Sequence, residues 1–190
     1  MEADIRSWDL SVPEEINRMV TDTLPANVDE VSKFKALLQA ISESSRSVPV
    51  IFPVHPRTRK IIDDLYKDNS LILKDSSETL NIHLVEPLGY HEFNYLVENA
   101  KAVITDSGGI TEETTVLGVP CITLRNNTER PETITIGTNE LIGTDPTNIK
   151  PALDKLFSGQ WKKGGIPELW DGGAAERIVG ALASQCDKDF

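Results

Sequence analysis

The sequence has few cysteines and no long apolar run. Only Cys121 and Cys186 are cysteines among 190 residues, too few for a disulfide framework and without the spacing of a metal site. No apolar stretch approaches the length of a membrane-spanning helix, and no basic segment followed by an apolar run begins at Met1. We therefore expect no membrane span, no secretory signal, no metal or other cofactor, and a reducing, cytoplasmic location.

Basic residues are also scarce. Nineteen lysines and arginines stand against 30 acidic residues, which gives a formal net charge of -11 at pH 7. This charge argues against nucleic acid or an anionic membrane as a partner. An anionic ligand remains compatible with this net charge, because helix N-termini and exposed backbone amides supply local positive potential.

The length of the chain suits one full domain, or one domain plus a fragment of another.

Short apolar, β-branched runs alternate with helical stretches along most of the chain. The runs at residues 50–54, 82–85, 102–105, 121–124 and 140–142 predict strands. Apolar spacing predicts helices at residues 31–41, 58–66, 93–100, 110–117, 146–157 and 174–183. This alternation is typical of βαβ units, so the sequence predicts an α/β fold with a Rossmann-like parallel sheet flanked by helices.

Three of the predicted strands are followed by polar loops. These loops are His55-Pro-Arg57, Asp106-Ser-Gly-Gly109 and the charged run at residues 125–132. Carboxyl ends of parallel strands share one edge of a sheet, which is where such folds bind ligands. Taken singly, the loops also fit a strand-exit turn, a capped glycine turn and a solvated loop. Their convergence favours a ligand site.

The loop at residues 106–109 has the composition of a phosphate site. Two glycines let a ligand approach the backbone, and the Ser107 hydroxyl and the N–H groups of the following helix suit a phosphate. Glu113 lies one turn into that helix, where a carboxylate can accept two hydrogen bonds from ribose hydroxyls. The alternative is that Glu113 is an ordinary solvated helix residue.

Several segments along the chain together match the motifs of one enzyme family. They are, in family order, Pro13-Glu-Glu-Ile-Asn-Arg18, Phe52-Pro-Val-His-Pro-Arg57, Glu86-Pro-Leu-Gly-Tyr90 with Phe93, Thr105-Asp-Ser-Gly-Gly-Ile-Thr-Glu-Glu113, Gly118-Val-Pro120, Arg125 followed by Thr128-Glu-Arg-Pro-Glu132, Gly143-Thr-Asp145, and Asp171-Gly-Gly-Ala-Ala-Glu-Arg-Ile178. In these segments the chain resembles the non-hydrolysing UDP-N-acetylglucosamine 2-epimerases. The resemblance implies the C-terminal lobe of a glycosyltransferase B-type fold with a fragment of the N-terminal lobe. We expect residues 1–24 to be that fragment, 25–173 the UDP-binding lobe, and 174–190 a terminal helix and tail.

The resemblance also implies a set of substrate-binding residues. UDP would lie with its diphosphate at Ser107, Gly108 and Gly109, its ribose at Glu113 and its uracil stacked on Phe93. Phe93 on an apolar helical face also fits a core residue. Three further residues match family positions beside the nucleotide: His55, Arg57 and Arg130.

The family reaction interconverts UDP-N-acetylglucosamine and UDP-N-acetylmannosamine by elimination and re-addition of UDP. Glu2, Glu14 and Arg18 match its catalytic region. A non-catalytic UDP-sugar-binding module, or a truncated relative without turnover, is the alternative. A glycosyltransferase donor lobe fits less well, because the segments at residues 13–18 and 128–132 match the epimerases better. A homodimer is an option that the sequence does not decide.

The chain departs from the family at its start. Residues 1–10 resemble a late strand and loop of the N-terminal lobe and residues 13–23 the following helix, while the acidic residue of an earlier strand has no counterpart. In the family, the tetrapeptide matching Asn27-Val-Asp-Glu30 follows a His-Arg pair that ends the first strand of the C-terminal lobe. We therefore expect that strand and its histidine to be missing.

The strands of a doubly wound sheet lie side by side in the order 3-2-1-4-5-6. By the resemblance, residues 50–54 form the second strand and residues 102–105 the fourth, so a missing first strand leaves a gap between them. Each buried unpaired backbone group would cost about 1–3 kcal/mol. We therefore expect a repaired sheet. Either the two strands pair directly or another segment fills the gap, with residues 3–8 as the best local candidate and a strand from a second copy as the alternative.

Overall fold

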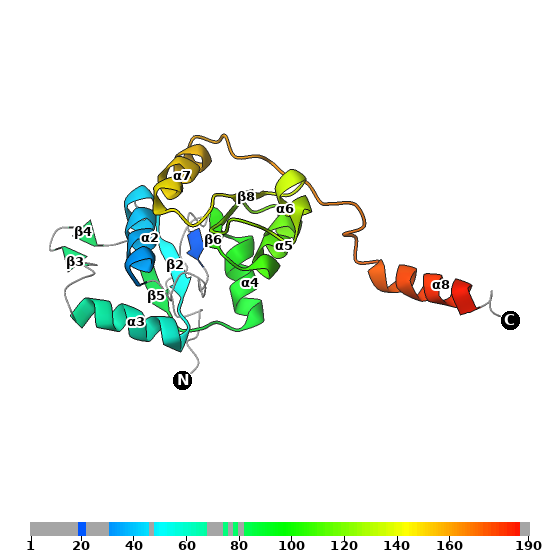
Figure 1. Ribbon diagram of the computed structural model, residues 1–190, viewed down its shortest axis with the longest axis horizontal. Helices are drawn as coiled ribbons and strands as arrows, with labels where there is room; N and C mark the ends of the chain where they lie inside the picture. Colours follow the sequence, from blue (N-terminus) through cyan, green and yellow to red (C-terminus); the bar gives the residue numbers. More distant parts are fainter. Residues whose placement is uncertain are drawn as a thin grey trace.

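The computed structural model describes residues 19–21, 31–45, 48–67, 74–75, 78–79 and 82–186. Six parallel strands form one sheet in the order β5-β2-β1-β6-β7-β8 (Figure 1). The strands are β1 (Met19–Thr21), β2 (Val50–Pro53), β5 (Ile82–Val85), β6 (Ala102–Thr105), β7 (Cys121–Thr123) and β8 (Asn139–Leu141). A separate antiparallel pair, β3 (Lys74–Asp75) and β4 (Glu78–Thr79), was not predicted. The predicted fold class is confirmed.

Helices cover both faces of the sheet. They are α2 (Val31–Ser44), α3 (Pro56–Lys67), α4 (Tyr90–Glu98), α5 (Gly108–Leu117), α6 (Pro131–Thr135), α7 (Ile149–Phe157) and α8 (Ala174–Cys186). Met19 packs with residues of α2 and α7, whereas its neighbour Val20 packs with residues of α4 and α5. Successive strand side chains point to opposite faces, so these two contacts place the helix pairs on opposite sides of the sheet.

The strand β1 fills the central position of the sheet. Met19 pairs with Val50 of β2 on one side and with Ala102 of β6 on the other. The expected gap between β2 and β6 is therefore repaired, but not by residues 3–8, which lie outside the described residues. The prediction of a missing first strand is wrong, as is that of a helix at residues 19–21.

Physical context explains this error. Met19–Thr21 is only three residues long and buried on both faces, so it carries no alternation that could distinguish a strand from a helical turn. In the fold, β2 and β6 each offer a row of backbone donors and acceptors to this segment, and the Met19 N–H donates to Pro49 O at 2.9 Å.

The remaining predicted elements are confirmed with shifted ends. The segment predicted as a helix at residues 146–157 divides into the short 3-10 helix η2 (Pro146–Asn148) and α7. The helix α6 begins at the last two residues of the run expected to be a charged loop. Pro131 at its first position and Glu132 in its first turn favour helix initiation there. No helix in the described ranges is both long and apolar enough to cross a bilayer.

The helix α8 projects from the body of the molecule (Figure 1). Its side chains Ile178, Val179 and Leu182 are 59–66% exposed. Its position agrees with the predicted terminal helix, while the three predicted domain boundaries stay predictions.

Candidate functional site

The turn between β6 and α5 presents hydrogen-bond donors at the carboxyl edge of the sheet. Ser107 is the N-cap of α5 with an extended backbone (φ -81°, ψ 126°), and its hydroxyl makes no capping hydrogen bond. Its N–H donates to the Thr105 hydroxyl at 2.9 Å, which holds the turn in place. Because the first turn of α5 contains no acidic residue, its N–H groups and helix dipole favour an anion.

Space next to this turn is open. A Cβ atom added at Gly109 would meet only the Ser107 hydroxyl, at 4.0 Å. One added at Gly108 would meet only Arg125, whose Nη1 lies 4.0 Å away. A ligand can therefore approach the backbone of Gly108 and Gly109 closely, and a guanidinium group lies beside that approach.

The sequence did not assign Arg125 a role, although it belongs to a matching segment. It is half-buried and lies two residues beyond the end of β7, the strand that neighbours β6. The parallel pairing of β6 with β7 brings Arg125 to the turn that starts α5. That order of strands is the signal that points to Arg125, and it becomes available only once the sheet is known.

His55 and Arg57 lie at the same sheet edge, between β2 and the first turn of α3. Both side chains are exposed. The Arg57 N–H donates to His55 Nδ1 at 3.3 Å, so a neutral imidazole carries its proton on Nε2. In this tautomer, His55 exposes its Nε2–H donor at the sheet edge.

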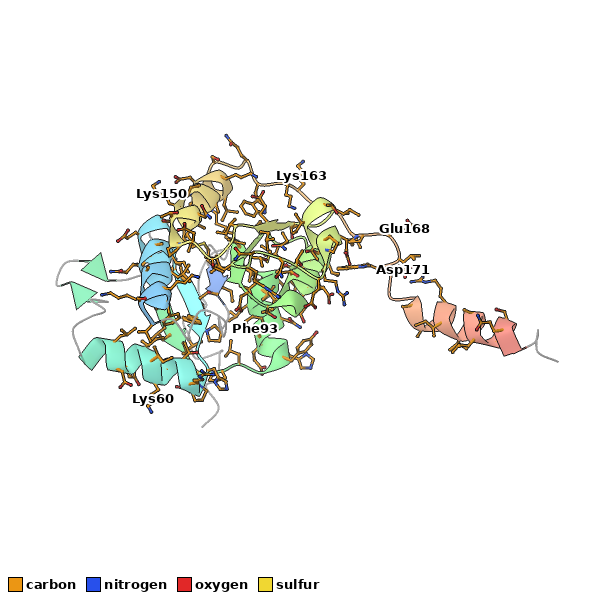
Figure 2. All side chains as sticks on the ribbon, viewed as in Figure 1. Lys60, Phe93, Lys150, Lys163, Glu168 and Asp171 are labelled. Carbon is orange, nitrogen blue, oxygen red and sulfur yellow. The ribbon has the colours of Figure 1, made fainter. Side chains whose placement is uncertain are left out.

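Phe93 lies in the first turn of α4 (Figure 2). It is partly buried against the apolar cluster that contains Val20, Ile51 and Ile110. The neighbouring Tyr90 is 66% exposed and makes an edge-to-face contact with His91, with ring centroids 5.7 Å apart. The ring of Phe93 thus contacts the core while retaining partial exposure, so both of its predicted roles remain compatible with its position.

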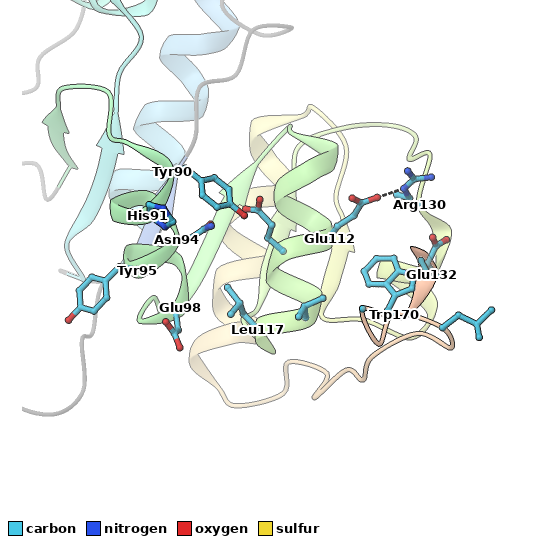
Figure 3. Close-up of a pocket in the computed structure, with 15 residues that line it drawn as sticks. Tyr90, His91, Asn94, Tyr95, Glu98, Glu112, Leu117, Arg130, Glu132 and Trp170 are labelled. Carbon is cyan, nitrogen blue, oxygen red and sulfur yellow. Dashed lines mark hydrogen bonds and ion pairs between the residues drawn. The ribbon is translucent and has the colours of Figure 1, made fainter. Parts of the chain in front are cut away.

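Glu113 and Arg130 border an open groove of about 950 Å³ between α4, α5, α6 and residues 169–174 (Figure 3). The carboxylate of Glu112 forms an ion pair and hydrogen bond with Arg130 Nε. This contact ties Arg130 to α5, beside Glu113, and raises the pKa of Arg130 above its ordinary value. Glu112 was not among the predicted residues, because a glutamate in a helix normally indicates only solvation.

The structure brings together most of the predicted binding residues. Ser107, Gly108, Gly109 and Glu113 lie on one turn and its helix, Arg130 is tied to that helix, and His55 and Arg57 occupy the same sheet edge. The predicted catalytic residues, Glu2, Glu14 and Arg18, lie outside the described residues. In the described ranges, no three histidine, cysteine or acidic side chains gather as a metal site would require.

Comparisons with known proteins identify the family of the chain. A sequence profile of the UDP-N-acetylglucosamine 2-epimerase family matches residues 25–183. UDP-N-acetylglucosamine 2-epimerase of Methanococcus maripaludis is 43% identical over 133 residues, covering 69% of this chain and 35% of the relative. The enzyme of the same name from Methanocaldococcus jannaschii is 39% identical over 160 residues, covering 82% of this chain and 41% of the relative.

Solved structures give the same result. The M. jannaschii epimerase in complex with UDP-N-acetylglucosamine and UDP superposes with a TM-score of 0.71 at 36% identity, covering 88% of this chain and 45% of the other. The Neisseria meningitidis epimerase bound to UDP-N-acetylglucosamine gives 0.69 at 29% identity, covering 88% and 44%. The chain thus spans less than half the length of these relatives. With the family profile matching most of its residues, the chain belongs to the UDP-N-acetylglucosamine 2-epimerase family.

Proposed function

We propose that this chain supplies the UDP-binding lobe of a UDP-N-acetylglucosamine 2-epimerase. The observation that carries the proposal is the open turn at Gly108 and Gly109, with the N-terminus of α5 on one side and Arg125 on the other. Such a turn offers backbone donors, a hydroxyl and a cation to one diphosphate. The two epimerase structures with bound UDP-sugar support the ligand class.

In the proposed complex, the diphosphate contacts the backbone N–H groups of Gly108 and Gly109, the Ser107 hydroxyl and Arg125. The ribose hydroxyls donate to the carboxylate of Glu113, and uracil stacks on the partly exposed face of Phe93. We assign a second group of residues to the sugar-diphosphate end of the ligand: His55, Arg57 and Arg130. All three are exposed.

The proposed reaction needs a base and a stabilised leaving group. A base removes the proton at C2 of the sugar, a C1–C2 double bond forms, and the C1–O bond breaks with its electron pair leaving on UDP. Reprotonation at C2 on the opposite face and re-addition of UDP complete the epimerisation. The positive end of α5 and Arg125 would stabilise the departing UDP anion. Glu2, Glu14 and Arg18 are the residues that we propose for the catalytic region.

One sequence feature favours the second candidate, a UDP-sugar-binding module without turnover. Residues 22–27, which directly follow β1, contain neither histidine nor arginine, whereas the resemblance implies a His-Arg pair after this strand. Loss of one member of a catalytic unit commonly lowers the rate by several orders of magnitude. We therefore expect this chain to bind UDP but to epimerise far more slowly than the M. jannaschii enzyme.

The test supplies UDP-N-acetylglucosamine without an acceptor and follows formation of UDP-N-acetylmannosamine by NMR. UDP binding is measured on the same preparation by calorimetry, and a mock preparation from the same host without this chain controls for contaminating host epimerase. Turnover at the rate of the M. jannaschii enzyme would refute the expected loss of activity. Failure to bind UDP would refute the proposed function itself.

Three related expectations stay predictions. They are the division into residues 1–24, 25–173 and 174–190, a cytoplasmic location, and a homodimer as the form of assembly. Light scattering of the purified protein tests the homodimer directly.

A further inference from the structure

A buried chain of hydrogen bonds connects the sheet to the helix that begins after Arg130. Asn139, the first residue of β8, is fully buried. Its Oδ1 accepts a hydrogen bond from the Thr123 hydroxyl at 2.6 Å, and its Nδ2 donates to the Thr133 hydroxyl at 3.3 Å. The Thr133 hydroxyl in turn donates to the backbone carbonyl of Arg130 at 2.8 Å. Each threonine hydroxyl has one proton to donate. The donors therefore follow one another from Thr123 of β7 through Asn139 and Thr133 to the carbonyl of Arg130.

The other end of α6 is held by a different segment. Lys162 Nζ donates to the carbonyl of Ile134, and the Gly165 N–H donates to the carbonyl of Ile136 at 2.7 Å. Trp161 Nε1 donates to the carbonyl of Thr138 at 2.9 Å. Hydrogen bonds from residues 161–165 therefore hold the end of α6 in place, while the hydrogen bonds of Thr133 and Asn139 hold its start.

The Thr133 and Asn139 side chains are better protected from water than the ion pair of Arg130. The guanidinium group pairs with Glu112, but the two side chains are 53% and 36% exposed. Exposed ion pairs contribute little to holding a side chain in place, because solvent screens them and ordering costs entropy. The Thr133 and Asn139 side chains, in contrast, are both fully buried. An amide whose hydrogen bonds are made inside the protein has few alternative orientations.

We propose that Thr133 and Asn139 are positioning residues that set the backbone of Arg130, and with it the placement of its guanidinium group against the diphosphate end of a nucleotide-sugar. This proposal rests on the proposed function, in which Arg130 contacts the ligand. It predicts that the two polar side chains affect UDP binding only through Arg130.

The experiment is a double-mutant cycle on the full chain with UDP as the ligand, measured by calorimetry. Thr133→Val has nearly the same shape as threonine but removes the hydroxyl. Asn139 Nδ2 then loses its acceptor, and the Arg130 carbonyl keeps the Thr133 N–H, at 3.1 Å, as its donor. We expect it to weaken UDP binding by about three- to tenfold, the equivalent of one ordinary hydrogen bond. Thr133→Ser keeps the hydroxyl and should restore the affinity. In an Arg130→Ala background, Thr133→Val should change the affinity by less than about twofold.

Thermal unfolding of each variant separates positioning from loss of fold. If Thr133→Val does not fold, Asn139→Asp tests the same link, because it keeps the acceptor for Thr123 and removes the donor to Thr133. An equal loss of affinity with and without the Arg130 side chain would overturn the proposal, because the effect would then not pass through Arg130. An unchanged affinity of the folded variant would overturn it as well. If Arg130→Ala alone leaves UDP binding unchanged, the assigned role of Arg130 in the proposed function fails instead.

Discussion

Replacement of Glu113 by alanine separates recognition of ribose from recognition of diphosphate. Glu113 is half-buried on α5, just over one turn from the glycines that we propose hold the diphosphate. Its carboxylate is proposed to accept hydrogen bonds from ribose hydroxyls, which pyrophosphate lacks. Glu113→Ala should therefore weaken the binding of UDP and leave the binding of pyrophosphate nearly unchanged.

The expected size of this effect follows from the number and kind of bonds lost. A hydrogen bond to a charged group contributes about 1.5–3 kcal/mol, and partial exposure of Glu113 places its effect near the lower end of that range. Loss of about 1.4 kcal/mol corresponds to a tenfold change in the dissociation constant. We therefore expect UDP to bind about tenfold more weakly or worse, and pyrophosphate to change by less than about twofold.

Titration calorimetry with both ligands measures the difference. Glu98→Ala is the matched control, because Glu98 is an exposed carboxylate of α4 on the same groove but has no assigned contact with UDP. This control should change neither dissociation constant, which excludes a general effect of removing one negative charge. Equal weakening of UDP and pyrophosphate by Glu113→Ala would refute the reasoning and identify Glu113 as a structural residue.

Two further predictions concern stability. Met19→Ala removes a fully buried side chain of the central strand and should lower the free energy of unfolding, measured by urea titration, by about 2–5 kcal/mol. The control Val31→Ala, at a 42% exposed position of α2, should lower it by less than about 0.5 kcal/mol. Similar losses for the two variants would show that β1 lies outside the cooperative core. Burial raises the pKa of the Cys121 thiol from its ordinary 9.0 to about 11, so its contribution to stability is complete below pH 9 and decreases by about 2–3 kcal/mol as the pH rises to 11. Cys121→Ala should therefore lose less stability than the parent protein over this interval, and identical pH profiles would contradict the assignment.

Local sequence was sufficient for the elements with a long or well-bounded pattern. The strands β2, β5, β6 and β7 are apolar, β-branched runs, and their order along the chain already implied a parallel sheet. The turn at Ser107, Gly108 and Gly109 was also predictable, because glycines between a strand and a helix indicate close approach of a ligand to the backbone. In these cases, a few neighbouring residues contain the whole signal.

Tertiary structure decided the features that depend on residues distant in the sequence. Met19–Thr21 became a strand because β2 and β6 supply its backbone partners from both sides. Arg125 reached the turn at Gly108 because β7 lies next to β6, and Asn139 acquired its two hydrogen-bond partners because β8 lies next to β7. A three-residue buried segment, an arginine after a strand and a single asparagine each fit many local contexts. Their positions and contacts follow from the order of strands, since hydrogen bonds and close packing require partners that only the folded sheet brings within reach.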